Sequence, residues 1–473
     1  MNKKVLVYGD FYVLHPGHIR FLKFAKKYGD DLYIGVNNNR PTINFPDPID
    51  RIAALKSLNI DATVFLVDDS IKKNIFEIKP DFIIKGNEYK DSLNVESEWL
   101  QLWGGQLVFA SGDSADLDGY NFLESHYSDP ISKPRDYEQR HACSRLDLIK
   151  IIGKFATKKV LVIGDLILDE YIQCVALGMS REDPTLVVSP LDSKRYLGGA
   201  AIVASHASKL TGDVRYIGIV GEDIEADYAE AKLTDYGVKS FLIRDRSRAT
   251  TLKQRYRVEE KTMLRVSRLK QHEIDKSIED MVYSLLEKMI SDIDVLIISD
   301  FNYGCLSRNL INRIHGLLQK HQIIVGVDCQ TSSQMGDITK YMNPTLMSPT
   351  EFEARAALRD PHSGLQNISN VLIDKTNAKL VLLTLGSDGV LITSQDKDPI
   401  SDLHTDVLPA FNNRPVDPAG AGDSMLVVAS IALSVGATNF QAAYLGSLAA
   451  AVQVSRIGNI PICKSDLMRL VDL

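Results

Sequence analysis

The sequence predicts an α/β protein with two domains, and three observations lead to this prediction. Short apolar runs alternate with helical patterns along most of the chain, as in βαβ units around a parallel sheet. The run "KKVLVYGD" at 3–10 returns as "KKVLVIGD" at 158–165, and each is typical of a buried strand that ends in a glycine turn. The 473 residues allow two or three domains of about 150 residues each. Because the residues after the two runs differ completely, the runs mark the first strands of two different domains.

We expect the first domain at 1–125, a linker at 126–142 and the second domain at 143–473. The linker segment is polar and contains two prolines. In the first domain, apolar runs and helical spacing predict strands at 5–9, 31–36, 62–67, 81–86 and 106–110 and helices at 17–29 and 47–58. In the second domain they predict strands at 160–165, 214–221, 294–300, 323–328 and 380–386, helices at 144–156 and 424–437, and a small β lid at 250–269.

Composition excludes several classes of protein. The net charge of −7 argues against a nucleic acid as the main partner. The basic stretch "KQRYRVEEKTMLRVSRLK" fits alternating charge on a solvated lid better than nucleic-acid contact. No apolar run approaches the roughly 18 residues of a membrane helix, and "MNKKVLVYGD" lacks the apolar core of a signal peptide. Five scattered cysteines without a CxxC pair argue against a metal cluster and for a reducing cytoplasm.

Two histidines lie where the first predicted strand passes into a helix. His15 and His18 are three residues apart, so they can face the same side of the first helical turn. Backbone N–H groups of a first turn have no internal partners, and the positive end of the helix dipole favours phosphate there. Pro16 presets the turn, and Gly17 lets the backbone approach a ligand. Histidines that only cap a loop are the alternative, but the strand, glycine turn, paired histidines and helix together favour a phosphate site.

The stretch "GDFYVLHPGHIRFL" at 9–22 resembles the GxFDxxHxGHxxxL motif of the nucleotidyltransferase superfamily. Over about residues 3–124 the chain is similar to the adenylyltransferase domain of the bifunctional heptose-phosphate kinase/adenylyltransferases, with matches in "DPIDRIAAL" and "IKPDFIIKGNEY". The resemblance implies a Rossmann-like nucleotidyltransferase fold that joins a nucleoside triphosphate to a sugar 1-phosphate and releases pyrophosphate. It implies catalytic roles for His15 and His18 and a nucleotide- or phosphate-binding role for Gly9, Phe11, Gly17, Arg51, Lys85 and Gly86.

This domain also differs from the family pattern. Tyr12 stands where the family has an aspartate, and Arg40 is the only cation in the loop after the second strand. The late loop contains three carboxylates that would repel phosphate groups, at Asp113, Asp116 and Asp118. An alternative therefore stays open, in which the N-terminal domain is a non-catalytic module that binds a nucleotide or a sugar phosphate.

Four small residues in a row, Ala419, Gly420, Ala421 and Gly422, precede a long apolar helical run. Small side chains leave backbone N–H groups open at a helix N-terminus, where they form an anion hole. Asp423 follows in the first turn. A carboxylate there can take a proton from an attacking hydroxyl while the amides hold the transferring phosphoryl group. An N-capping aspartate is the alternative, but it does not explain the four small residues.

The segment "DPAGAGD" at 417–423 resembles the GAGD motif of the ribokinase-like (PfkB) sugar kinases, and the match extends over about 143–473. The resemblance implies a ribokinase-like fold, ATP as a substrate, Mg²⁺ as a cofactor, Asp423 as the base and Glu351 as the metal-side residue. For the nucleotide it implies Thr384, Gly386, Gly389 and the turn 419–422, and for the sugar it implies Asp165, Asp169, Arg181, Gly198 and Gly199.

Some positions differ from the kinase pattern as well. The family's asparagines of GGAAN and NxxE are Ile202 and Ser348, and Pro418 follows the first aspartate of the GAGD segment. Two family lysines that suit a phosphorylated sugar are replaced by Tyr303 and Gln330. The lid-like segment offers cations that could compensate, at Lys253, Arg255 and Arg257.

The predicted function is that of a bifunctional sugar-activating enzyme. It would phosphorylate a heptose-like sugar or sugar phosphate with ATP and transfer a nucleotide to the sugar 1-phosphate. The related bifunctional enzymes have the kinase first, so the domain order is reversed here. A sugar kinase with a regulatory N-terminal domain is the alternative, and the intact GAGD turn argues against a scaffold with two degraded sites. We also expect a homodimer formed through the kinase lid.

Overall fold

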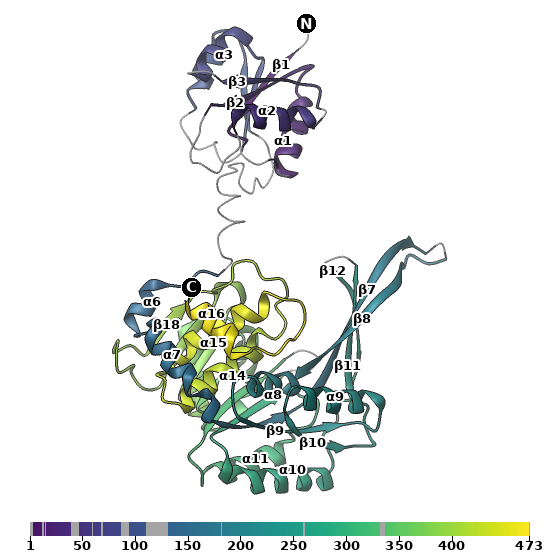
Figure 1. Ribbon diagram of the computed structural model, residues 1–473, viewed down its shortest axis with the longest axis vertical. Coiled ribbons are helices and arrows are strands. Elements are labelled where there is room, and N and C mark those ends of the chain that lie inside the picture. Colours follow the sequence, from purple (N-terminus) through teal and green to yellow (C-terminus); the bar gives the residue numbers. More distant parts are fainter. Residues whose placement is uncertain are drawn as a thin grey trace. The chain divides into compact units, whose positions relative to one another are not determined.

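The computed structural model describes residues 3–11, 14, 16–38, 47–58, 60–67, 70–86, 94–109, 131–180, 182–258, 261–331 and 336–472. The chain divides into two compact units, residues 1–129 and 130–473, and each is described by itself (Figure 1). Within the described ranges, none of the helices has the length and apolar character needed to cross a bilayer.

The first unit is built on a five-stranded sheet in the order β3-β2-β1-β4-β5. All its strand pairs are parallel, which confirms the predicted βαβ pattern. The strand order changes direction at β1, where open α/β sheets bind ligands outside the carboxyl ends of the strands. The elements are β1 (Lys4–Gly9), α1 (Pro16–Lys26), β2 (Asp31–Asn37), α2 (Pro48–Ser57), β3 (Thr63–Val67), α3 (Ile71–Ile78), β4 (Phe82–Lys85), α4 (Glu96–Gln101) and β5 (Gln106–Phe109).

Alternate side chains of β1 show how both faces of this sheet are buried. Val5 and Val7 pack on one face with Leu22 of α1, whereas Leu6 packs on the other face with Ile75 of α3. All five side chains are fully buried, as the two-residue period of a strand between two helical layers requires. Because both faces are covered, a ligand site of this unit belongs at the carboxyl edge of the sheet.

The second unit contains a nine-stranded sheet in the order β10-β9-β6-β13-β14-β15-β16-β17-β18. The strands from β10 to β16 are parallel, and β17 and β18 continue the sheet antiparallel. These strands are β6 (Lys159–Gly164), β9 (Asp213–Val220), β10 (Lys239–Arg244), β13 (Val295–Asp300), β14 (Ile324–Cys329), β15 (Leu346–Met347), β16 (Leu380–Thr384), β17 (Val390–Ser394) and β18 (Thr405–Leu408).

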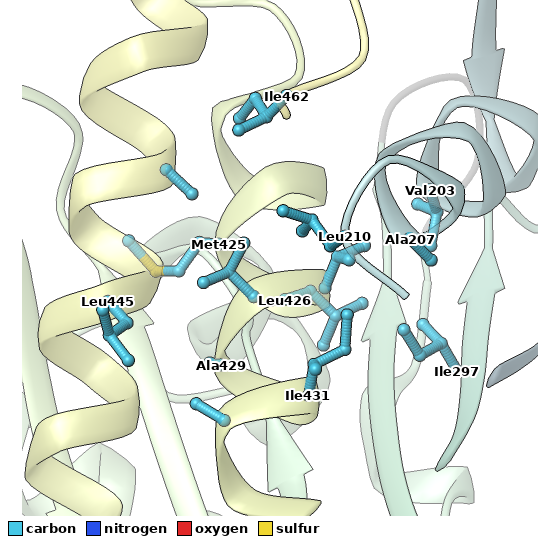
Figure 2. Packing of buried hydrophobic residues seen from close by; sticks show 14 of the residues in the cluster. Val203, Ala207, Leu210, Ile297, Met425, Leu426, Ala429, Ile431, Leu445 and Ile462 are labelled. Carbon is cyan, nitrogen blue, oxygen red and sulfur yellow. The ribbon is translucent and has the colours of Figure 1, made fainter. Parts of the chain in front are cut away.

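Helices cover both faces of this sheet. One face packs with α7 (Arg145–Gly153), α8 (Ala200–Ser208), α9 (Ile224–Asp235), α14 (Ala421–Ser434), α15 (Asn439–Val454) and α16 (Lys464–Asp472). The other packs with α10 (Lys276–Met289), α11 (Arg308–Leu318), α12 (Glu351–Leu358) and α13 (Leu365–Thr376). Figure 2 shows α14 in the centre of the first layer, with Leu445 of α15 on one side and Ala207 of α8 on the other. The apolar run that the sequence predicted as a helix is therefore the central helix of this layer.

The lid is larger than the sequence predicted. It is a four-stranded sheet in the order β12-β11-β7-β8, made of β7 (Leu166–Met179), β8 (Leu186–Gly199), β11 (Thr251–Val258) and β12 (Lys261–Arg268). Only β11 and β12 fall in the predicted segment 250–269. The sequence did not predict that the 14-residue strands β7 and β8 belong to the lid. Their outer ends extend away from the body of the unit (Figure 1).

Residues 131–142, which we predicted to belong to the linker, pack on the second unit. Within them α6 (Arg135–Arg140) buries Tyr137, whose hydroxyl donates to the carbonyl oxygen of Phe440 at 2.9 Å. The fully buried ring of His141 stacks on Phe440 at 4.2 Å between centroids, and its two nitrogens lie 2.9 Å from Asp398 Oδ2 and 2.8 Å from Asp406 Oδ2. The polar side chains that suggested a linker therefore serve to attach the segment to this unit, since Arg140 and His141 pair with its carboxylates.

Candidate active sites in the two units

The anion hole predicted in the second unit lies at the start of α14. Gly420 precedes the helix with a φ of +79°, a conformation that glycine adopts without strain. The amide N–H of Ser424 donates to the carbonyl oxygen of Gly420 at 3.0 Å, which closes the first turn. The first amides of a helix have no acceptor within it, so this turn offers N–H groups and a positive dipole end to an anion.

Asp423 lies in the first turn of α14 and is 5 % exposed. Burial and, to a smaller extent, the nearby carboxylates of Asp169 and Glu353 raise the pKa of its carboxyl to about 7, although the Lys253 ammonium opposes the rise. Its Oδ1 atom is buried without a hydrogen-bond partner among the described residues. A carboxylate with a pKa near neutrality and an open acceptor atom can take a proton from a substrate hydroxyl.

Two side chains hold the glycine loop in place. Asp417 accepts hydrogen bonds from the amide of Ala419 and the amide of Gly458, both at 3.1 Å. The side-chain amide of Gln453 donates to the carbonyl oxygens of Ala419 at 3.2 Å and Gly458 at 3.1 Å. The loop before α14 and the loop after α15 therefore form one rigid support behind the anion hole.

Asp169 of β7 lies on the same side of the molecule as Asp423, since the two carboxylates act on each other electrostatically. It forms an ion pair with Arg255 of β11 and accepts a hydrogen bond from the side-chain amide of Asn459 at 3.4 Å. A Cβ atom at Gly198 would lie 2.3 Å from Asp169 Oδ2, so only glycine leaves room for this carboxylate. The structure thus brings Asp169, Gly198 and Asp423 of the predicted site together.

Lys253 of β11 is a lid lysine whose charge acts on Asp423. It is the strand neighbour of Asp169, and it is 7 % exposed. Its ammonium lies 5.2 Å from the ring centroid of Phe301 and 5.3 Å from that of Tyr303. Tyr303 occupies the position where the resembled family has a lysine, so the aromatic ring there faces a cation that comes from the lid instead.

Asp165, which the sequence predicts as a sugar-binding residue, follows β6 and is buried. Its carboxylate accepts hydrogen bonds from the backbone amides of Phe301 at 2.9 Å, Tyr303 at 3.3 Å and Cys305 at 3.4 Å. Burial and the neighbouring Asp300 raise its pKa. The carboxylate therefore holds the loop after β13 in place.

Two glutamates lie in the first turn of α12: Glu351, which the sequence predicts as the metal-side residue, and Glu353. The Glu351 side chain is 43 % exposed, and its carboxylate pairs with Arg355 at 2.7 Å. Glu353 is buried, forms the capping box of α12 with Thr350 and accepts the amide of Thr331 at 2.9 Å. It acts on Asp423, and burial with the charges of Glu353 and Asp423 raises the pKa of Asp328 well above its usual range. Neither Glu353 nor Asp328 was predicted as a site residue, although Asp328 ends the strand predicted at 323–328.

The predicted nucleotide-side residues lie at the turn between β16 and β17. Thr384 ends β16, and its amide donates to the carbonyl oxygen of Pro349 at 2.9 Å, which places it beside the start of α12. Gly386 and Gly389 both have positive φ, +64° and +95°. This turn and the start of α12 therefore lie side by side at the carboxyl end of β16.

In the first unit, three predicted residues surround the end of β1. Phe11 has a φ of +48°, an uncommon conformation for a bulky residue that occurs at functional turns. Its ring lies 5.3 Å from that of His18, and His18 is 2 % exposed. The buried guanidinium of Arg51 donates to the carbonyl oxygen of Asp10. Gly9, Phe11, His18 and Arg51 thus meet at the carboxyl edge of the sheet.

Lys85 of β4 is held by neighbouring acceptors. Its ammonium lies 3.1 Å from Glu96 Oε1 and 2.9 Å from Asn94 Oδ1, and Tyr8 also donates to Glu96. Burial of Glu96 opposes ionisation, yet the hydrogen bonds from Tyr8 and Lys85 leave its pKa below the usual value. The charge of Lys85 is therefore already balanced. Gly86 follows β4 and is buried.

Several predicted positions lie outside the described residues: Tyr12, His15, Arg40, Asp113, Asp116, Asp118 and Arg181. Gly17 belongs to α1. Within the described ranges, no three His, Cys, Asp or Glu side chains form a group that could hold a metal ion by themselves. Mg²⁺ commonly takes only one or two protein carboxylates and completes its shell with phosphates and water. The acidic side chains around Asp423 fit that mode of binding.

The second unit defines the class of protein: an α/β carbohydrate kinase with a ribokinase-like fold and a β lid. The family model described as pfkB family carbohydrate kinase matches residues 157–466, and the chain belongs to that family. A cytidylyltransferase-like model matches residues 6–118, which identifies the first unit as a cytidylyltransferase-like domain. The predicted fold class is thereby confirmed.

Similar proteins support these assignments. Ribokinase from Thermotoga maritima aligns with a TM-score of 0.53 and 18 % identity over 67 % of this chain and 100 % of its own. Phosphofructokinase-2 from Escherichia coli aligns with a TM-score of 0.54 and 16 % identity over 67 % and 99 %. Both show the fold alone.

Two curated relatives are more similar in sequence. The bifunctional protein HldE of Helicobacter hepaticus is 31 % identical over 66 % of this chain and 64 % of its own length. That of Desulfatibacillum aliphaticivorans is 29 % identical over 67 % and 63 %. The chain therefore spans less than two thirds of the curated relatives that it matches.

Proposed function

We propose that the second unit phosphorylates a hydroxyl group of a heptose-like sugar or sugar phosphate with ATP. The observation that carries this proposal is the buried Asp423 in the first turn of α14, next to the glycine loop and within electrostatic reach of Asp169 and Lys253. A base, an anion hole and a cation in one site would suit phosphoryl transfer.

In the proposed step, Asp423 takes the proton of the acceptor hydroxyl. The acceptor oxygen then forms a bond to the γ-phosphorus of ATP, and the bond from that phosphorus to the bridging oxygen of ADP breaks. The amides of 420–422 hold the equatorial oxygens of the transferring group, because they point to where negative charge develops. Asp169 orients the sugar through a hydroxyl, and Arg255 holds that carboxylate in place by an ion pair.

Mg²⁺ and ATP belong to this proposal. Carboxylates on the Glu353 side of Asp423 would hold the ion together with the phosphates, and the ion would neutralise charge on the γ-phosphate. Thr384, Gly386 and Gly389 would lie along the nucleotide. A cytoplasmic location also belongs to this proposal, because ATP is available there and free cysteines stay reduced.

We propose nucleotidyl transfer to a sugar 1-phosphate as the activity of the first unit. The cytidylyltransferase-like domain and the cluster of Phe11, His18 and Arg51 support it. A second candidate is a module that only binds a nucleotide or sugar phosphate. The ion pair of Lys85 with Glu96 favours this candidate, because it occupies the cation that the family uses for phosphate.

Two assays on the full chain test these proposals. ADP formation is measured with ATP, Mg²⁺ and D-ribose, D-fructose 6-phosphate or sedoheptulose 7-phosphate as acceptor. Pyrophosphate release is measured with each nucleoside triphosphate and a panel of sugar 1-phosphates. ADP formation that depends on a sugar supports the kinase, and its absence with every acceptor contradicts it. Pyrophosphate release separates the transferase from the binding module.

We also propose that the lid forms a homodimer. Its strands expose many apolar side chains: Val175, Leu177, Met179, Leu186, Val187, Leu191, Met263, Leu264 and Val266. Exposed apolar patches of this kind mark contact surfaces. Leu177→Asp should produce monomers in light scattering, whereas Leu146→Asp, on the equally exposed Leu146 of α7, should leave the oligomeric state unchanged. Identical masses for the wild type and both variants would contradict the lid interface.

A further inference from the structure

A second buried acceptor atom lies beside the glycine loop that precedes the proposed base. The side chain of Asn459 is 5 % exposed, and its Oδ1 atom has no hydrogen-bond donor among the described residues, as is also true of Asp423 Oδ1. Buried polar atoms in proteins almost always have a partner. Two open acceptors in one site therefore indicate a ligand that brings two donors.

The amide of Asn459 bridges the sugar side and the phosphoryl side of the site. Its Nδ2 atom donates to Asp169 Oδ2 at 3.4 Å. Its Oδ1 atom fills the space in front of Gly420, where a Cβ atom would lie only 2.5 Å away. Since Nδ2 is used by Asp169, the open atom is the carbonyl oxygen, which can only accept a hydrogen bond.

The backbone around Asn459 is fixed by contacts that do not involve a substrate. Gln453 donates to the carbonyl oxygens of Gly458 and Ala419, and Asp417 accepts the amide of Gly458. The same two side chains support the glycine loop. Asn459 is therefore held in register with the anion hole, as a residue that positions a substrate must be.

Position 202, where the resembled kinases have a polar residue, does not take this role. Ile202 is fully buried in the apolar cluster beneath α8. A polar contact that the resembled kinases make from this position must therefore come from another element here. Asn459 is a buried amide that is hydrogen-bonded to Asp169.

We propose that Asn459 is a specificity-determining residue of the kinase site, whose Oδ1 atom accepts a hydrogen bond from a second hydroxyl group of the acceptor sugar while Asp423 receives the reacting hydroxyl. This proposal rests on the kinase function proposed above. A hydroxyl group can donate to Oδ1, whereas a phosphate dianion cannot. Asn459 thus selects a polyol at this position and rejects acceptors that lack the second hydroxyl, because their binding would leave Oδ1 buried without a partner.

The test compares Asn459→Ala with the wild type, using D-ribose, D-fructose 6-phosphate and sedoheptulose 7-phosphate and the deoxy analogues of the best of them. The expected result is a KM for that acceptor about tenfold higher, an unchanged KM for ATP, and loss of the preference for the hydroxylated acceptor over one deoxy analogue. Sugar-induced stabilisation in thermal melts without ATP should fall in parallel.

A matched variant separates positioning from general damage. Asn412 is also a buried amide of this unit, and it donates to the carbonyl oxygen of Ala451 at 3.2 Å. Asn412→Ala should lower the melting temperature and leave the acceptor KM and the deoxy preference unchanged. In Asn459→Asp the added carboxylate lies beside Asp169, so the acidic limb of the pH–rate profile should move to higher pH.

The outcomes are distinguishable. If the wild type neither binds nor phosphorylates any acceptor, the kinase function fails and this assignment fails with it. If the wild type is active and Asn459→Ala keeps its acceptor KM and its deoxy preference, the assignment to Asn459 alone is overturned. Equal losses toward ATP and sugar would also overturn it, because they indicate a structural role.

Discussion

Lys253 and Asp423 come from different layers of the second unit, one from the lid and one from α14, yet their charges act on each other. Burial is the largest cause that raises the pKa of Asp423, and the Lys253 ammonium opposes the rise, so that the pKa lies at about 7. The lid therefore contributes to the chemistry of the site as well as to its shape. A base that titrates near neutral pH makes the kinase step sensitive to both residues.

Asp423→Asn should abolish ADP formation because it removes the proton acceptor. It should also stabilise the fold. The folded-state pKa of about 7 lies above that of an exposed aspartate, about 3.9, so ionisation destabilises the folded state progressively as the pH rises from about 4 to 7. The melting temperature of the variant should exceed that of the wild type more at pH 8 than at pH 5. A variant that melts below the wild type at pH 8 would contradict the burial argument.

Lys253→Met should move the acidic limb of the kcat/KM profile to higher pH. The ammonium stabilises the ionised carboxylate of Asp423, so its loss makes the base harder to ionise. Lys253→Arg keeps the charge and should keep the limb near its wild-type position. The measurement is ADP formation at saturating ATP between pH 5 and 9. An unchanged limb in Lys253→Met would remove the electrostatic link.

Glu353→Gln should move the same limb to lower pH. Burial is the largest cause that raises the pKa of Asp423, and the carboxylates of Asp169 and Glu353 raise it as well. The Glu353→Gln substitution replaces one of these carboxylates by a neutral amide. Glu351→Gln is the matched control, because Glu351 pairs with Arg355 and its side chain is 43 % exposed. It should leave the limb in place. The opposite pattern, a shift with Glu351→Gln only, would return Glu351 to the site as the sequence predicted.

Glu96→Gln should destabilise the first unit at neutral pH, since Lys85 would lose its ionic partner. The folded-state pKa of Glu96 lies below its usual value, so its stabilising effect is present above the unfolded pKa near 4.5 and is lost as the pH falls through the folded pKa. Calorimetry should show a lower melting temperature at pH 7 and a difference that shrinks toward pH 4. A constant difference across this range would argue against the ion pair.

Much of the architecture could be predicted from the sequence, because apolar periodicity follows burial directly. The parallel sheets, the helix at 424–437 and the first-turn position of Asp423 are of this kind. The sequence predicted Glu351 and not Glu353 on the metal side, and it predicted sugar-binding roles for both Asp165 and Asp169. Each pair lies within four residues, and only the direction of the side chains separates them. Asn459 gave no signal, because its partner Asp169 is 290 positions away.

The packing of residues 131–142 sets where the kinase part of the chain can be cut. A protein that starts at residue 143 would lose the ring of His141 from between Asp398 and Asp406 and would uncover Phe440. The buried carboxylate of Asp398 would keep its hydrogen bonds from Ser401, and Asp406 would keep the one from the amide of Val407, but both would lose the imidazole between them. Separate expression of an active kinase should therefore require a start at or before residue 131, some ten residues earlier than the sequence alone suggests.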